Sequence, residues 1–467
     1  MSRTDWARRF AAPCLAAAAF ASALAPAAQA HTSEPALTHS VATAITYVKS
    51  LQDDAGNYVS TGLSNEWAFS GLAAAHVAAA DIWATGDANR NARRTYRLAL
   101  ADPTWPSASP VATDYERATL NSYSAGIDPA RVSPTRNLIA NVVSTWSTSN
   151  PGYYGSPSLF NGAVFGLLAL SGATTSSGAR RVPQALLDKT IAVVKANQHF
   201  NGGWDFSKAE GNHANLTAAG DIDMTGAALA SLCQAGVANT DAAVVAGKNY
   251  LKATYNTTTG AFNYPFGANT DSNGWAQSGL NACGFDAQGS DFTGPSGATP
   301  VDFLVGQQVS GGGFRYGTTG TTPNAYASLD AFRALAGGAF SATPPAPSVT
   351  TSEPRFVGDT TFVAGTQSKL ALVVDDGSGT LKVCSVALSA TGTTTLGAVL
   401  TAATTSATPS GCVSGFSPTS GTITTINGVS NAGASTWKSS LDGSSPIGAD
   451  AGTTVHLGDT VSLKYGT

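Results

Sequence analysis

The pattern of apolar and polar positions divides the chain into a helical part, up to about Gly338, and a strand-rich part after it. In the helical part, two kinds of helix alternate. One kind carries charges on one side, as in residues 184–198, where Asp188 and Lys195 lie among apolar positions. The other kind is built of small and apolar residues, as in 158–171. A helix that is apolar all round is buried, so we expect the small-residue helices inside and the charged helices outside.

A turn that combines glycine with an aromatic residue recurs along the helical part. It is found as Gly56-Asn57-Tyr58, Pro151-Gly152-Tyr153, Gly202-Gly203-Trp204, Gly260-Ala261-Phe262 and Gly312-Gly313-Phe314. The last four turns lie roughly fifty residues apart, a spacing typical of repeat architectures. The first gap is about twice as long. One repeat has therefore lost its turn, and residues 103–110 are the expected place.

Each repeat is predicted to contain two helices. The outer helices are expected at 39–52, 87–102, 135–148, 184–198, 241–255 and 299–309. The inner helices, which follow the turns, are expected at 64–80, 111–126, 158–171, 221–236, 273–284 and 323–337. Six buried helices inside six amphipathic helices form a closed double ring. The prediction for residues 31–340 is therefore an α6/α6 toroid.

The composition changes after the toroid. Residues 341–354 are rich in Pro, Ser and Thr, which is typical of a linker. From residue 355 onward Thr and Val dominate, and alternation replaces helical spacing, which indicates strands. We predict strands at 370–374, 453–457 and 460–465, a short helix near 395–403, and turns at Asn427-Gly428 and Asp442-Gly443. Residues 355–467 thus form a small β-rich domain, and the toroid should fold without it because its core closes on itself.

Residues 1–30 have the features of a signal peptide. Arg8 and Arg9 precede an Ala-rich apolar run, and Ala28-Gln29-Ala30 is a small-x-small cleavage site. No later stretch is long and apolar enough to span a membrane. The formal net charge of −4, with 12% charged residues, excludes a basic surface for nucleic acid. We expect a secreted, extracellular monomer.

Four cysteines follow the signal peptide, and they fall into two pairs by position. Neither pair has the spacing of a metal site, and an oxidising compartment favours disulfides. Cys233 and Cys283 lie about one repeat apart near the ends of neighbouring inner helices, so we predict a bridge between them. Cys384 and Cys412 would form a second bridge in the β-rich domain. The alternative is four buried free thiols.

Both parts of the chain resemble known families. The aromatic turns and small-residue helices resemble the repeats of prenyltransferases and squalene cyclases. In the second part, the segments 393–400, 426–429, 437–443 and 457–461 follow in an order that looks like the transcobalamin-like C-terminal domain. A toroid followed by this β module is similar to transcobalamin and intrinsic factor, over roughly residues 40–467.

This resemblance implies a non-enzymatic carrier of a small amphiphilic ligand, with a corrinoid (cobalamin) held between toroid and β domain. It also implies a cell-surface receptor or transporter as partner. His213, in the loop before the fourth inner helix, would be the cobalt ligand, and Asp223 would contact the corrinoid. The plainer interpretation of His213 is a solvated loop residue.

Three kinds of side chain complete the candidate ligand site. Asn273 and Gln277 lie one helical turn apart at the start of the fifth inner helix, where they would hold ligand amides or merely cap and line the toroid. Asn427 and Trp437 are candidates for the facing wall on the β domain. Trp437 is equally well explained as part of that domain's core.

An enzymatic interpretation rests on Asp221-Ile222-Asp223-Met224-Thr225. This segment resembles the Asp-x-Asp-Asp-Thr motif of class II terpene cyclases, whose middle Asp protonates an alkene. Asp223 would be the general acid and Asp221 its neighbour, but Met224 replaces the last acid of the motif. In the structural alternative both carboxylates are helix caps.

Two further functions are weighed against the residues: protein prenylation and an interaction module. Protein prenylation needs a metal site of Asp, Cys and His, and none of the six His stands beside a Cys at ligand spacing. An extracellular interaction module that binds peptide or glycan is compatible with the composition. We therefore expect a non-enzymatic ligand-binding protein without an enzyme cofactor, with a terpene-cyclase-like enzyme and an interaction module as alternatives.

Overall fold

The computed structural model describes residues 32–54, 67–106, 109–175, 178–206, 220–263, 267–348, 367–389, 394–443, 445–456 and 458–467. Several features expected from the sequence lie outside these ranges. They are the signal peptide at 1–30, the first aromatic turn at 56–58, His213 and the second half of the linker at 349–354.

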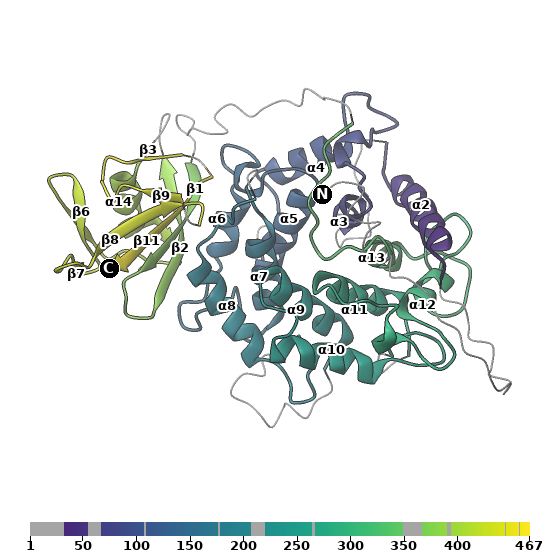
Figure 1. Ribbon diagram of the computed structural model, residues 1–467. Helices are drawn as coiled ribbons and strands as arrows, with labels where there is room; N and C mark the ends of the chain where they lie inside the picture. Colours follow the sequence, from purple (N-terminus) through teal and green to yellow (C-terminus); the bar gives the residue numbers. More distant parts are fainter. Residues whose placement is uncertain are drawn as a thin grey trace, which may run out of the picture.

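Two rings of helices form the toroid in the described part of the chain, as expected (Figure 1). The outer ring consists of α2 (Glu34–Ser50), α4 (Ala92–Ala101), α6 (Leu138–Val143), α8 (Gln184–Ala196), α10 (Ala242–Thr254) and α12 (Pro300–Gly306). The inner ring consists of α3 (Trp67–Ala74), α5 (Ala112–Ser124), α7 (Asn161–Gly172), α9 (Ile222–Gln234), α11 (Thr270–Ala282) and α13 (Ala325–Leu335). Each inner helix contacts the next, and α13 contacts α3, so the ring is closed.

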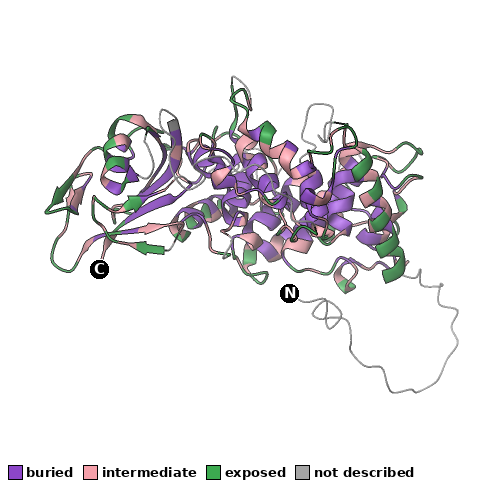
Figure 2. Ribbon diagram, turned by 90° about the horizontal axis from the view of Figure 1, so that it is seen from above, coloured by how far each residue is buried: buried purple, intermediate pink, exposed green. Residues whose placement is uncertain are grey.

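The local sequence explains where the inner helices begin and which residues they bury. Asp221, Asn269 and Asn324 are the N-caps of α9, α11 and α13, and each side chain accepts a hydrogen bond from a backbone N–H of the first turn. Every residue from 162 to 171 of α7 is buried. Buried residues are concentrated in the inner ring, and exposed residues lie on the outer helices (Figure 2). The small-residue pattern therefore predicts the layers correctly.

The aromatic turns fasten the outer helices to the inner ones. Trp204 is fully buried, and its indole N–H donates to the carbonyl of Val194 in α8 over 2.7 Å. Gly202, with φ +91°, lies so close to the carbonyl oxygen of Ala246 that a side chain would not fit. Glycine and tryptophan thus act together, since one allows the close approach and the other fills the space beneath.

A segment after α13 closes one end of the toroid. We call residues 338–348 the strap. Phe340 of the strap is fully buried, Ser341 Oγ donates to Gln234 at the end of α9 (2.9 Å), and the N–H of Ala342 donates to Ser124 at the end of α5 (3.2 Å). These partners lie at the C-terminal ends of inner helices. Residues 341–348, which we predicted as linker, are therefore packed across this end of the ring.

The second domain is built around a six-stranded sheet with the order β4-β2-β1-β11-β8-β9. Its strands are β1 (Gln367–Asp375), β2 (Leu381–Ser389), β4 (Ala407–Thr408), β8 (Thr436–Leu441), β9 (Ser445–Ile447) and β11 (Thr460–Gly466). β1 and β11 are parallel, and the other neighbours are antiparallel. Helix α14 (Leu396–Ser406) packs on β2. Two smaller sheets pair β3 (Thr394–Thr395) with β10 (Thr454–Val455), and β6 (Thr422–Ile426) with β5 (Phe416–Thr419) and β7 (Val429–Ser430).

The sheet of the second domain packs directly on the toroid beside helix α6. Alternate residues of β1 serve two cores: Leu370, Leu372 and Val374 face α14, whereas Ala371 and Val373 join the core of the toroid. A strand covered on both faces has a continuous apolar sequence, which explains the run at 370–374. In Figure 1 the β domain lies at the side of the ring.

Both predicted disulfides are present. Cys233 at the end of α9 bridges Cys283 at the end of α11, with their Cα atoms 5.1 Å apart. Cys384 of β2 bridges Cys412, with a Cα separation of 6.1 Å. No helix in the described ranges combines the length and the hydropathy needed to cross a membrane.

Candidate functional site

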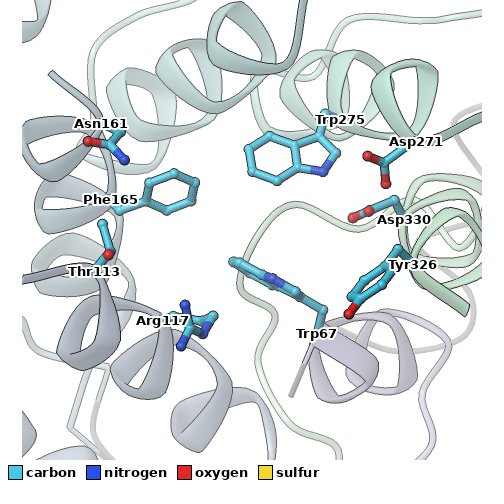
Figure 3. A pocket seen from close by; sticks show the side chains of 9 residues that line it. All are labelled: Trp67, Thr113, Arg117, Asn161, Phe165, Asp271, Trp275, Tyr326 and Asp330. Atoms are coloured by element: carbon cyan, nitrogen blue, oxygen red, sulfur yellow. The ribbon is translucent and has the colours of Figure 1, made fainter. Parts of the chain in front are cut away.

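A cavity of about 410 Å³ lies in the lumen of the inner ring. Five of the six inner helices contribute side chains to its wall (Figure 3). The lining residues are Trp67, Thr113, Arg117, Asn161, Phe165, Asp271, Trp275, Tyr326 and Asp330. They belong to the first two turns of their helices. The cavity therefore lies toward the N-terminal ends of the inner ring, opposite the strap.

The lining residues follow one rule of helix geometry. Four inner helices each contribute two residues four positions apart, which lie one above the other on the same helix face. The pairs are Thr113 with Arg117, Asn161 with Phe165, Asp271 with Trp275, and Tyr326 with Asp330. Asp223 occupies the corresponding position in α9, two residues after the N-cap, as Asp271 does in α11.

Aromatic rings form the floor and much of the wall. The ring centroids of Trp67, Phe165 and Trp275 lie 5.8–6.4 Å from one another. Phe340 of the strap lies 4.9–6.2 Å from the same three rings, mostly edge to face. Because Phe340 comes from the segment that closes the toroid, its ring blocks the lumen at that end.

Carboxyl groups gather on one wall of the cavity. Asp271 and Asp330 point toward each other in Figure 3, and Asp223 interacts electrostatically with both. Burial, followed by repulsion from Asp221 and Asp330, raises the pKa of Asp223 to about 7. Burial, and then the charge and hydrogen bond of Asp330, also raise the pKa of Asp271. Near neutral pH this wall therefore holds protons that ordinary aspartates have lost.

A buried arginine balances part of this charge. Arg333 is fully buried, and its Nη2 lies 2.6 Å from a carboxylate oxygen of Asp330. Its Nε donates to Ser278, and its guanidinium lies 4.6 Å from the ring centroid of Phe340. Arg333 thus links the carboxyl wall to the aromatic floor. It contacts the floor from behind and does not line the cavity.

The opposite wall of the cavity is also polar. Arg117, Asn161 and Thr113 lie across from the two carboxyls in Figure 3. Arg117 pairs with Asp114 over 3.3 Å. The cavity therefore has carboxyls at one side, a guanidinium and an amide at the other, and indole rings between.

The four site residues that we predicted in the toroid have different surroundings in the structure. Asp221 caps α9, and Asp223 lies beside the carboxyl wall without lining the cavity. Asn273 is fully buried: its amide oxygen accepts from the N–H of Phe262, and its amide nitrogen donates to the carbonyls of Phe262 and Asn269. Gln277 is buried and donates to the carbonyl of Ala334. Their roles in ligand binding stay predictions.

The predicted residues of the second domain have local partners. Trp437 is 3% exposed, donates to the carbonyl of Val429 and packs against Tyr465. Asn427, in the predicted turn, has φ +53° and accepts a hydrogen bond from the N–H of Ser414. Neither residue lines the lumen. Their roles in ligand binding stay predictions, as does the role of His213 as cobalt ligand.

Sequence reasoning missed most of the cavity wall, including Arg117, Asp271, Trp275, Tyr326 and Asp330. A usable signal was present. When the inner helices are aligned by their first residues, each lining position is the first or second residue of its helix, or the residue four positions later. The described residues contain no group of three or more His, Cys, Asp or Glu that would hold a metal ion.

Comparison with protein-family models and with curated proteins found no match. Among solved structures, the chain is similar to the type II terpene cyclase MstE from Scytonema, with 10% identity, 65% of this chain and 98% of that chain covered, and a TM-score of 0.41. Geranylgeranyltransferase-I from Candida albicans matches with 13% identity, coverage of 58% and 82%, and a TM-score of 0.40. Haptocorrin in complex with Cbi matches with 13% identity, coverage of 94% and 98%, and a TM-score of 0.35. At these scores the matches carry no functional argument; the expected order of toroid and β domain is confirmed by the helices and strands themselves.

Proposed function

We propose that this protein binds a small molecule non-covalently in the lumen of its toroid. The observation that supports the proposal is the cavity itself. Phe340 closes it at one end, aromatic rings line it, and a few polar groups converge on it, which is the usual composition of a ligand pocket. Its volume of about 410 Å³ lies within the range of small-molecule sites.

We further propose that the protein works outside the cytoplasm. Two disulfides are favoured in an oxidising compartment. The proposal includes a cell-surface receptor or transporter that receives the ligand, as expected for a carrier.

The experiment fills the lumen and asks whether binding is lost. Cyanocobalamin, geranylgeraniol and choline are titrated into the full chain by calorimetry. Thr113→Trp places a large ring inside the cavity, whereas Thr401→Trp places the same ring on the exposed face of α14. We expect at least one probe to bind the unmodified protein and Thr401→Trp, but not Thr113→Trp. Failure of all probes would contradict the proposal and favour an extracellular interaction module.

A corrinoid is the first specific ligand in this test, because the chain has a toroid followed by a β domain. A corrinoid is larger than the lumen, so it would cover the opening near Asp223 and bring in His213 as cobalt ligand. In that case cobalamin would show a shifted absorption band, and His213→Ala would change the spectrum more than the affinity. An unshifted spectrum and no binding heat would contradict the corrinoid proposal.

A second candidate is a class II terpene-cyclase-like enzyme. Carboxyl groups that stay protonated near neutral pH would supply the proton for an alkene, and the indole rings beside them would stabilise the carbocation that forms. Asp271 lines the cavity, whereas the Asp223 expected from the motif lies beside it. Under this proposal, incubation with an isoprenoid alkene gives a cyclic product by mass spectrometry, and either Asp271→Asn or Asp223→Asn abolishes it.

A further inference from the structure

We propose that the ligand of the lumen is an organic cation, a protonated amine or a quaternary ammonium, with an acceptor group at its other end. This inference rests on the proposed function, in which the lumen is the binding site. It assigns the chemical class of the ligand from three features of the cavity: its rings, its carboxyls and its opposite polar wall.

The rings form a cage of the kind that binds cations. Trp67 and Trp275 stand on opposite sides of the cavity in Figure 3, with Phe165 at the left and Tyr326 beside Trp67. The centroids of the two indoles are 6.4 Å apart, and their planes are inclined by 64°. A trimethylammonium group attracts the negative faces of such rings, and tryptophan binds cations best. The cage is lined by aromatic carbon and needs no hydrogen bond from the cation.

The carboxyl wall supplies charge that the protein itself does not balance. Asp223, Asp271 and Asp330 interact with one another, and Arg333 brings one positive charge to the group by its 2.6 Å contact with Asp330. In the empty cavity this wall lowers its negative charge by keeping protons, as the raised pKa values of Asp223 and Asp271 indicate. A bound cation would supply the missing positive charge directly, so the wall favours a cationic ligand over a neutral one.

The opposite wall sets the nature of the other end of the ligand. Arg117, Asn161 and Thr113 offer N–H and O–H donors there. A wholly apolar chain that filled the lumen would remove these groups and the carboxyls from water without replacing their hydrogen bonds. A ligand with a cationic group at the carboxyl side and a carboxylate or carbonyl at the Arg117 side satisfies both walls.

The experiment compares three small probes by calorimetry on the full chain. They are choline, its neutral analogue with a tert-butyl group in place of trimethylammonium, and γ-butyrobetaine, which adds a carboxylate at the other end. We expect choline to bind at least about tenfold more tightly than the neutral analogue. We expect γ-butyrobetaine to bind more tightly than choline. These ratios need no variant, so they do not depend on whether a substituted lumen folds.

Two substitutions then locate the effect. Asp271→Asn should weaken choline binding severalfold and leave the neutral analogue unchanged, because the amide cannot lose a proton and become the carboxylate that balances the bound cation. Asp291→Asn, which changes an exposed carboxylate between Lys248 and Lys252, is the matched control and should change neither. Equal affinity for choline and its neutral analogue would overturn the cation inference while lumen binding stands. Absence of binding by all three would overturn the cation inference, and the lumen site would fall with it only if cyanocobalamin and geranylgeraniol also fail to bind. Choline binding that survives Thr113→Trp would overturn the inference together with the lumen site.

Discussion

At the scale of single residues, the chain holds several carboxyl groups in a neutral form. Asp223 and Asp271 keep protons beside the cavity because burial and neighbouring carboxylates disfavour their charge. Glu116, fully buried on α5, has a pKa raised well above its ordinary value for the first of these reasons. Protonated acids of this kind donate hydrogen bonds or protons, which exposed aspartates at neutral pH do not.

The raised pKa of Asp223 predicts a pH dependence of stability. The folded state keeps a proton on Asp223 that the unfolded state loses, so the contribution of Asp223 to the free energy of unfolding falls as pH rises from 3.8 to about 7 and changes no further above that value. Urea denaturation at several pH values should show that Asp223→Asn makes this decline shallower. Asp271→Asn should act in the same direction, because the pKa of Asp271 is also raised.

The control for this prediction has the opposite sign. Lys248 and Lys252 lower the pKa of Asp291 to about 2, so its contribution to stability is present above pH 3.8 and is lost as pH falls toward 2. Asp291→Asn should therefore leave the decline between pH 3.8 and 7 unchanged. An identical decline in the unmodified protein and in Asp223→Asn would contradict the assignment of a raised pKa to Asp223.

At the scale of elements, the contact between α9 and α11 shows how the inner ring closes. Gly226 of α9 lies against the backbone of Trp275 and Ala276, and Gly279 of α11 lies against the backbone of Gly226. The two helices approach so closely because neither residue has a side chain. The Cys233–Cys283 bridge then joins their C-terminal ends.

A methyl group at this contact should be costly. Gly226→Ala should lower the free energy of unfolding by about 1–3 kcal/mol, because backbone atoms cannot move aside as a flexible side chain would. Gly306→Ala in outer helix α12 meets no atom within 4 Å. It should leave stability unchanged or raise it by up to about 1 kcal/mol. Chemical denaturation that found equal effects for the two substitutions would show that the inner helices are not tightly packed at Gly226.

At the scale of the whole molecule, the two domains share one core. Ala371, Val373, Leu381 and Val383 of the sheet belong to the same buried cluster as the apolar residues of α6. Two ion pairs cross the contact, Arg131 with Asp459 (3.4 Å) and Arg181 with Asp442 (3.7 Å). A toroid without residues 355–467 would expose this face of α6, so we now expect it to be less stable than in the full chain.

The shared core predicts that the two domains unfold together. Differential scanning calorimetry of the full chain should show one cooperative transition. Val383→Asp places a charge in the contact and should split or broaden that transition, whereas Thr401→Asp, on the exposed face of α14, should not. Two well-separated transitions in the unmodified chain would mean that the contact contributes little to stability.

The sequence by itself determined the elements and their layers. Helix caps such as Asp221, turns such as Gly202-Gly203-Trp204 and the buried run in α7 act over a few residues, so their consequences can be read locally. The same holds for the two disulfide pairs: the positions of Cys233 and Cys283 follow from the repeat, and Cys384 and Cys412 are the two cysteines of the second domain.

Only the tertiary structure decided what the lumen contains. Trp67, Phe165 and Trp275 meet because ring closure brings helices far apart in sequence to one axis, and the pattern within one helix does not show which other helices it will face. The start of the predicted linker is a similar case: a segment rich in Pro and Ser is typical of a linker, and only the tertiary structure shows that Ser341 donates to Gln234 at the end of the ring, next to the buried Phe340. For Asn273 the sequence left open a ligand contact or a residue that caps and lines the toroid; the tertiary structure adds that its amide pairs with the backbone of Phe262 in the preceding turn, and its role in ligand binding stays a prediction.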